Sequence, residues 1–303
     1  ESDVLWLHGW DSKLKRRGLL LARELGVPVL MRGENTMVAM PDGGGLRGMV
    51  KRHYLRTIFK HCAGFLCIGT DNHRYFEAHG IEEARLFSMP YAVDNEFFAE
   101  RAAEASERRE DFRRELGLQT DRSVILFAGK LQRRKHAMTL LKAWRTLSEG
   151  STMAPYLLYV GDGEERAQLE AEAGDDDRIK VLGFRNQTEL PAFYDLADVF
   201  VLASEREPWG LAVNEAMACG TAVLVSDQCG CASDLVSTEC GAVVAGGDIG
   251  ALASALKGLF VSVQDLRTKG EAARRRISTW GFDEDITGLK AALKVVCPVP
   301  GSA

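Results

Sequence analysis

The sequence predicts a doubly wound α/β protein with two domains, each built around a parallel β-sheet. Short apolar runs alternate with longer helical patterns, and continuous apolar strands between helices are typical of parallel sheets that are covered on both faces. A strongly charged segment, 101–116, ends at Gly117 just before a new apolar run begins, and this break divides the strands into two sets. The apolar runs are 4–7, 27–31, 64–68, 124–127, 156–160, 179–182, 199–202 and 222–225.

The charged break places the domain boundary. We expect residues 1–117 to form an amino-terminal Rossmann-like domain and residues 118–303 to form a carboxy-terminal one. A last helix is predicted at 283–296, after the second sheet is complete, and it could pack back on the first domain.

Composition excludes several classes of protein. The 303 residues are 46% hydrophobic and 27% charged, which is typical of a globular chain with a sizeable core. A net charge of -5 gives no basic field, so we expect no nucleic-acid partner. The longest apolar stretches are too short to cross a bilayer, and the start has no secretion-signal pattern. The seven cysteines form no CxxC pair, which favours reduced thiols and a cytoplasmic location.

The segment 205–220 carries the most chemical information. It follows a predicted strand, opens a helix near Gly210 and ends at Gly220. A helix that starts at the carboxyl end of a parallel strand presents free N–H groups and a positive dipole end, which suit a diphosphate. Glu207 lies in the loop before the helix and Glu215 about one turn inside it, so the two carboxylates can accept hydrogen bonds from hydroxyls on different parts of one ligand.

Glu207-x7-Glu215, followed by Ala-Met-Ala-Cys-Gly, resembles the E-x7-E motif of the family 4 retaining glycosyltransferases, which have the GT-B fold of two facing Rossmann-like domains. The resemblance covers 3 to about 296. It implies retaining transfer of a hexosyl group from a nucleotide diphosphate sugar, with a UDP-sugar as the preferred donor, to a hydroxyl of a sugar or lipid-linked sugar in polysaccharide or glycolipid synthesis. It also implies that Glu207 meets the donor sugar, that Glu215 holds the ribose, and that Gly210 and Leu211, beside Trp209, offer N–H groups to the diphosphate.

A second segment, 127–135, predicts an anion pocket, because four cations follow a glycine at a strand's carboxyl end. By the resemblance, Lys130 stands where relatives usually have Arg, and Lys135 stands at their Lys position; both would neutralise the leaving diphosphate. Lys130 therefore replaces a bidentate fork with a point charge. Arg133 and Arg134 are expected to face solvent.

Glycines at other strand ends complete the predicted donor side. Gly129, Gly161 and Gly183 permit close approach of the backbone to a ligand. The resemblance implies that the turn containing Phe184 lies against the nucleotide base.

The first domain supplies the candidates on the acceptor side. Many relatives carry a His within the stretch that corresponds to 27–35, and this chain has none there. Arg32, Glu34 and Asn35 are candidates for acceptor or donor contacts, with simple loop roles as the alternative. His8 follows the first strand at the cleft edge, with a structural role as its alternative.

We expect neither a metal nor a cofactor. No Asp-x-Asp pair follows a strand, and the three Asp residues at 175–177 lie in a predicted loop. Two alternatives to transfer remain: a nucleotide-sugar epimerase of the same architecture, and a sugar-nucleotide binding protein without catalysis.

The segment 46–61 is basic and amphipathic. Such a helix fits either a core helix with a solvated basic face or a peripheral contact with the inner face of an anionic membrane.

Relatives begin with further strand–helix units before the part that resembles 3–10 here, so the resemblance implies a first domain that lacks its initial part. From this we expect donor binding to survive and transfer by this chain alone to be weak or absent.

Overall fold

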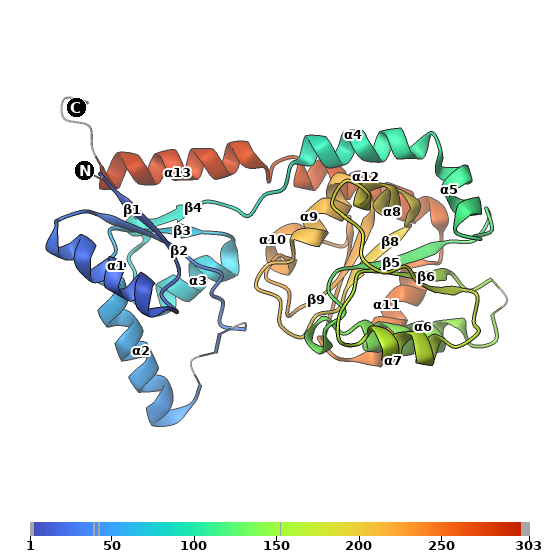
Figure 1. Cartoon of the computed structure of the whole chain (residues 1–303), viewed down its shortest axis with the longest axis horizontal. Helices are drawn as coiled ribbons and strands as arrows, with labels where there is room; N and C mark the ends of the chain where they lie inside the picture. Colours follow the sequence, from blue (N-terminus) through green and yellow to red (C-terminus); the bar gives the residue numbers. More distant parts are fainter. Residues whose placement is uncertain (1–2, 39, 42, 152, 298–303) are drawn as a thin grey trace. The chain divides into compact units, whose positions relative to one another are not determined.

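The computed structural model describes residues 3–38, 40–41, 43–151 and 153–297. The chain divides into two compact units, one formed by Glu1–Ala92 with Trp280–Ala303 and the other by Val93–Thr279 (Figure 1). The first unit is therefore made from two separate segments of the chain, and the second from one.

A four-stranded parallel sheet forms the centre of the first unit, in the order β1-β2-β3-β4. One face is covered by α1, α2 and α3, whose apolar side chains pack with those of β2 and β3. The other face is covered by α13, which lies along the sheet in Figure 1. The elements are β1 (Leu5–His8), α1 (Lys13–Glu24), β2 (Val29–Arg32), α2 (Gly45–Phe59), β3 (Gly64–Cys67), α3 (Thr70–Ala78), η1 (Glu83–Arg85), β4 (Leu86–Ser88) and α13 (Phe282–Val296).

Helix α13 is fixed to the sheet by apolar and polar contacts. Ala292 is buried against Leu30 and Leu66 of the sheet. The Arg32 guanidinium forms an ion pair with Asp285 at 3.0 Å. The segment predicted at 283–296 is thus helical, and it belongs to the first unit.

The second unit is built on a six-stranded parallel sheet in the order β10-β9-β8-β5-β6-β7. This is the doubly wound order in which the strand sequence reverses between β5 and β8, and ligands of such sheets bind outside the carboxyl ends of the strands at that reversal. The strands are β5 (Val124–Ala128), β6 (Tyr156–Val160), β7 (Ile179–Val181), β8 (Val199–Leu202), β9 (Ala222–Ser226) and β10 (Gly241–Val244).

Both faces of this sheet are covered, as the continuous apolar runs predict. All five residues of β5 and of β6 are buried. In Figure 1, α6, α7 and α11 lie on one face, and α8, α9 and α12 lie on the other. The helices are α4 (Asn95–Ser106), α5 (Arg109–Glu115), η2 (Arg133–Lys135), α6 (Ala137–Ser148), α7 (Arg166–Ala173), α8 (Leu190–Leu196), α9 (Leu211–Ala218), α10 (Ala232–Leu235), α11 (Ile249–Leu259) and α12 (Val263–Ile277).

The structure divides the chain at Ala92, whereas the sequence predicts a boundary at 117. The charged segment 101–116 is not one helix, because α4 ends at Ser106 and α5 starts at Arg109. Both helices pack on α8, through ring contacts of Phe98 with Tyr194 and of Phe112 with Phe193. These contacts place 93–117 in the second unit, and the charged residues are the solvated side of helices that also bury an apolar side.

Two strands differ from the apolar runs of the sequence. β4, with only three residues, and β10 (Gly241–Val244) are not among the apolar runs given above. The seven cysteines are all free thiols. By length and composition, no single helix among the described residues can cross a membrane; the pair Ile249–Leu259 and Val263–Val296, bent by 101°, passes that test only when combined.

Candidate functional site

A cavity of about 570 Å³ opens in the second unit, at the carboxyl ends of β5 and β6 and beside α9. Its position is the strand reversal where the doubly wound fold places ligands. The turns after β5, β6 and β7 supply one side, and α8 and α9 supply the other. The lining residues are Ala128, Gly129, Lys130, Gln132, Val160, Gly161, Asp162, Gly163, Phe184, Arg185, Leu190, Tyr194, Ala212 and Glu215.

Close packing of two turns shapes the floor of this cavity. Gly161 has φ 142°, and a Cβ there would lie 1.9 Å from the carbonyl oxygen of Gly129. The Gly161 N–H donates to the carbonyl of Gly183 at 2.8 Å. The three glycines predicted for the donor side therefore hold consecutive turns together, and only a residue without a side chain fits at Gly161.

Glu215 projects from α9 into the cavity. The hydroxyl of the fully buried Tyr194 donates to the Glu215 carboxylate at 2.7 Å. Burial raises the pKa of Glu215, and the Tyr194 hydrogen bond partly opposes that rise. The arrangement presents a positioned, partly desolvated acceptor of hydrogen bonds to a ligand.

Lys130 provides positive charge at the rim of the same cavity. It follows β5, is exposed, and has no carboxylate within ion-pair distance in the described part of the chain. A cation that is not neutralised by a neighbour remains available for an anionic ligand. Lys130 and Glu215 thus line one cavity, and their roles in ligand binding stay predictions.

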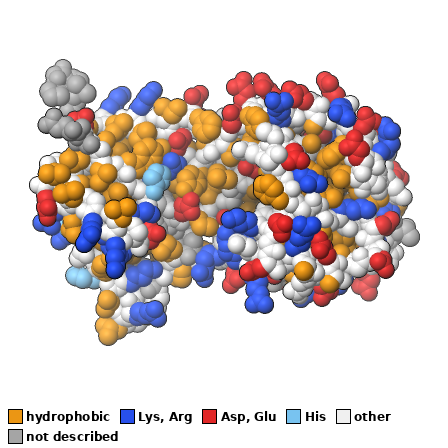
Figure 2. All heavy atoms as spheres, in the orientation of Figure 1, with side chains coloured by type: hydrophobic (Ala, Val, Ile, Leu, Met, Phe, Trp, Pro, Cys, Tyr) orange, Lys and Arg blue, Asp and Glu red, His pale blue; other side chains and the backbone are white. Residues whose placement is uncertain are grey.

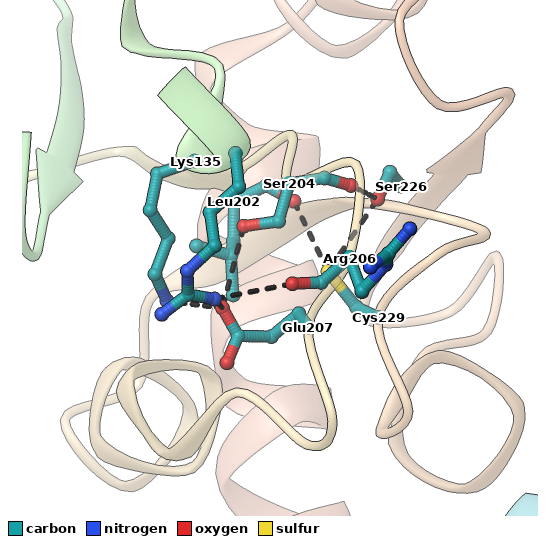
Figure 3. Close-up of polar contacts among 8 residues, drawn as sticks. Lys135, Leu202, Ser204, Arg206, Glu207, Ser226 and Cys229 are labelled. Carbon is teal, nitrogen blue, oxygen red and sulfur yellow. Dashed lines mark hydrogen bonds and ion pairs between the residues drawn. The ribbon is translucent and has the colours of Figure 1, made fainter. Parts of the chain in front are cut away.

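Glu207 and Lys135, which the sequence assigns to different parts of a ligand, bind each other (Figure 3). Arg134 approaches the same carboxylate at 3.7 Å, and the Ser204 hydroxyl donates to it at 3.4 Å. All three contacts use Oε2 of Glu207. The Lys135 and Glu207 side chains are largely buried, so the pair is a partly desolvated ion pair.

Two hydrogen bonds to backbone carbonyls join the loops that carry this ion pair. The Glu205 N–H donates to the carbonyl of Arg134 at 2.8 Å, and the Arg134 guanidinium donates to the carbonyl of Arg206 at 3.1 Å. Below them, the Cys229 thiol donates to the carbonyl of Leu202, visible in Figure 3. The chain then turns into α9 at Gly210, whose φ of 107° excludes most other residues.

The remaining donor-side candidates do not line the cavity with their side chains, except Phe184, whose ring is exposed at its edge. Trp209 is buried, and its indole N–H donates to Asn214 at 2.9 Å. Gly210 is the N-cap of α9 and Leu211 is its first residue, where backbone N–H groups lack partners within the helix. Ala212, one residue further, lines the cavity.

The acceptor-side candidates all lie in the first unit, where each contacts other residues of that unit. Arg32 is buried over the Tyr91 ring at 4.7 Å, and the Tyr91 hydroxyl donates to Glu34 at 2.5 Å. Asn35 is buried, and its carbonyl accepts from Asn72 at 2.7 Å. His8 stacks on Trp6, and burial, with Arg32 and Lys15 nearby, lowers the pKa of His8. Each of these residues thus has a structural contact, and their acceptor role stays a prediction.

Among the residues that the structure describes, one group of side chains has the composition of a metal site. His73 lies 3.5 Å from Glu77 and 3.2 Å from Glu83, all in the first unit. Both ring nitrogens already face a carboxylate, and the two glutamates are exposed. This group is separate from the cavity, which lies in the second unit. In the cavity, the carboxylate of Asp162, in the turn after β6, pairs with Arg166 at 2.9 Å.

Sequence reasoning missed several residues of the cavity. It places Tyr194 in the core, and the ring is buried, yet the hydroxyl reaches Glu215. Gln132 and Arg185 line the cavity as well. The sequence offers one indication of this: both residues follow a strand, β5 or β7, by a few positions, and ligand-contacting side chains of this fold lie at the carboxyl ends of strands.

Similarity to solved structures defines the class. Sucrose-phosphate synthase from Thermosynechococcus elongatus is similar over 95% of this chain and 72% of its own, with a TM-score of 0.77 and 22% identity. The trehalose 6-phosphate synthase of Burkholderia multivorans is similar over 97% of this chain and 72% of its own, with a TM-score of 0.76 and 19% identity. Anabaena HepE in complex with UDP is similar over 94% of this chain and 78% of its own, with a TM-score of 0.76 and 16% identity. This is an α/β protein of the GT-B fold, with two Rossmann-like parallel sheets.

Sequence similarity then defines the family. Residues 108–276 match the family described as glycosyl transferases group 1, and the chain belongs to it. A D-inositol 3-phosphate glycosyltransferase of Xylanimonas cellulosilytica is 30% identical over 293 residues, which cover 93% of this chain and 69% of the relative. An uncharacterized glycosyltransferase of Methanocaldococcus jannaschii is 31% identical over 183 residues, covering 59% of this chain and 42% of its own. A D-inositol 3-phosphate glycosyltransferase of Salinispora arenicola is 29% identical over 224 residues, covering 70% of this chain and 50% of its own.

Proposed function

We propose that this chain transfers a hexosyl group from a UDP-sugar to an acceptor hydroxyl with retention at the anomeric carbon and without a metal ion. The observation that carries the proposal is the cavity at the strand reversal, which has the carboxylate of Glu215 on one side and the cation of Lys130 on the other. A nucleoside diphosphate has hydroxyls for the first group and negative charge for the second.

In this proposal each residue has a defined task. Glu215, held by Tyr194, accepts hydrogen bonds from the ribose hydroxyls. Lys130, the glycine turns and the first N–H groups of α9 stabilise the diphosphate, whose negative charge grows as it departs. When the donor binds, the Lys135 ammonium turns from Glu207 toward the diphosphate, and the Glu207 carboxylate is then free to accept a hydrogen bond from a sugar hydroxyl.

The reaction balances without a co-reactant. The bond between the anomeric carbon and the diphosphate oxygen breaks, and the acceptor oxygen bonds to the same face of that carbon. The acceptor proton passes to the departing diphosphate, and UDP leaves. Because retention can proceed on one face, this proposal needs no covalent enzyme intermediate.

Relatives support UDP as the nucleotide. Anabaena HepE has been solved with UDP and with UDP-glucose, and two other similar structures are a sucrose-phosphate synthase and a trehalose 6-phosphate synthase. The free cysteines fit the reducing cytoplasm, which we keep as the proposed location.

A nucleotide panel tests the proposal. Calorimetry with UDP, GDP and ADP should show preference for UDP, and UDP-sugar with an acceptor panel should release UDP. Equal binding of all three nucleotides would contradict the choice of base. Epimerised donor without acceptor would favour the epimerase alternative, and UDP binding without turnover across the panel would favour a binding protein.

A further inference from the structure

The solvent side of α2, in the first unit, carries a continuous row of apolar side chains. They recur at i, i+3, i+4 and i+8, which is the spacing of one face of a helix. Leu55, Ile58 and Phe59 of the same helix are buried against the sheet, so the row lies on the opposite side. The members of this α2 stripe are Leu46, Met49, Val50 and Tyr54, with exposed fractions of 73%, 54%, 61% and 45%.

Positive charge surrounds the α2 stripe. The stretch 45–60 contains five Lys or Arg residues and no Asp or Glu, although the whole chain has a net charge of -5. Arg47, Arg56 and Lys60 are exposed beside the stripe. In Figure 2, Lys and Arg side chains gather around hydrophobic ones on the part of the first unit where Figure 1 places α2.

These two properties together fit a lipid surface. A row of exposed apolar side chains is unfavourable in water and favours burial against another apolar surface. A cluster of cations without such a row would be satisfied by any acidic partner. An interface between water and hydrocarbon satisfies both, because apolar side chains enter the acyl boundary while Lys and Arg reach the lipid phosphates. The rest of the chain is net negative and is repelled by anionic lipids, so the protein should orient with α2 toward the membrane.

We propose that α2 docks the first unit on an anionic membrane surface through the α2 stripe and its flanking cations. The helix lies in the plane of the interface and does not cross it. This inference concerns α2 alone and does not rest on the proposed transfer reaction.

Vesicle co-sedimentation tests the proposal with the whole chain. Vesicles of phosphatidylcholine alone are compared with vesicles that also contain phosphatidylglycerol, at low and at high salt. We expect binding to the anionic vesicles and weakening by salt, because the cations contribute about fivefold in affinity each. Absence of binding to anionic vesicles at low salt overturns the proposal, as does equal binding to both kinds of vesicle.

Three variants separate lipid docking from simple charge attraction. Leu46→Gln with Met49→Gln and Val50→Gln keeps the charge and should reduce binding at least tenfold. Arg47→Gln with Arg56→Gln and Lys60→Gln keeps the stripe and should reduce binding to the anionic vesicles by about a hundredfold. The matched control, Lys142→Gln with Lys257→Gln and Arg275→Gln, removes three exposed cations from the second unit and should bind as the wild type does.

Each pattern of results decides the question. If the apolar variant binds vesicles like the wild type, charge alone causes the binding and the proposal fails. The basic surface would then fit an acidic protein or nucleic acid better than a membrane. Equal loss in the control triple would also contradict it. UDP titration of every variant reports whether the second unit is folded, and failure of all proteins, wild type included, to bind UDP would count against the proposed function and not against docking.

Discussion

The buried environment of Glu215 affects both the stability of the fold and the binding of a ligand. Burial raises its pKa, so the folded state holds the proton more tightly than the unfolded chain does. Ionisation of Glu215 at neutral pH therefore costs stability, and the cost disappears as the pH falls below the pKa of an unfolded glutamate. A residue that opposes folding and faces a cavity fits a functional role better than a structural one.

Glu215→Gln should weaken UDP binding at neutral pH by about 1–2 kcal/mol, because an amide accepts hydroxyl hydrogen bonds less strongly than a carboxylate. In the wild type, UDP affinity should fall as the pH drops through the raised pKa of Glu215, and in the variant this loss should be absent. Calorimetry at a series of pH values measures both. An identical pH dependence in the two proteins would remove Glu215 from the nucleotide site. Urea unfolding should show the variant to be the more stable protein at neutral pH.

Lys135→Met should destabilise the second unit by about 1–3 kcal/mol, because it leaves the Glu207 carboxylate partly buried without its main cation. Adding Glu207→Gln to that variant should recover much of the loss, since both charges are then gone. Urea unfolding of the two single variants and the double variant measures the coupling. Strictly additive effects would show that the ion pair is weak in solution.

Glu207→Ala should not weaken affinity for free UDP, because the proposed partner of Glu207 is the sugar and Lys135 is freed by the change, but it should reduce transfer. UDP calorimetry and UDP release from a UDP-sugar with acceptor measure the two properties separately. A loss of UDP affinity as large as that in Glu215→Gln would contradict this division of tasks.

At the scale of elements, the apolar runs predict most strands because parallel strands are buried on both faces, as in β5 and β8. β4 could not be predicted in that way, because a three-residue strand is too short for a pattern. β10 is only partly buried, and its short apolar run, 242–245, lies between glycines, so it lacks the burial on both faces that the argument assumes. Within the candidate site, the positions of Glu215 and Lys130 beside the cavity could be predicted from the spacing of the motifs. The ion pair of Glu207 with Lys135 could not be predicted, because spacing places residues on elements but does not show which side chains meet when no ligand is bound.

Gly161→Ala tests how closely the turns after β5 and β6 must approach. Its Cβ would meet the Gly129 carbonyl oxygen at 1.9 Å at a φ of 142°, so the turn must move. We expect a loss of about 1–3 kcal/mol in stability together with weaker UDP binding. Gly258→Ala, within α11, is the control, because apart from the nearby backbone of its own helix no atom lies within 4 Å of the added Cβ. It should stabilise the protein by about 0.5–1 kcal/mol. Equal stability of both variants would show that the turns can separate freely.

At the scale of the whole molecule, the two units should respond independently to a change in α13. A Cβ on Gly288 would lie 1.8 Å from the carbonyl oxygen of Ser88, so Gly288→Ala should loosen α13 from β4 and destabilise the first unit. The proposed UDP site lies in the second unit and should be unaffected. Hydrogen exchange of β3 and β4, with UDP calorimetry, measures the two effects, and Lys290→Ala on the exposed side of α13 is the control. Loss of UDP binding in Gly288→Ala would show that the units do not act independently.

The return of α13 to the first sheet has a consequence for synthesis on the ribosome. Leu30, Leu66 and Met89 emerge early, but the helix that buries them emerges only after the whole of Val93–Thr279. The second unit is continuous in sequence and can fold as soon as it leaves the exit tunnel, while one face of the first sheet is still bare. During that interval the nascent chain presents an apolar surface that a chaperone can bind. Slow translation before α13 would therefore lengthen the period in which the first unit, and not the second, is exposed to aggregation.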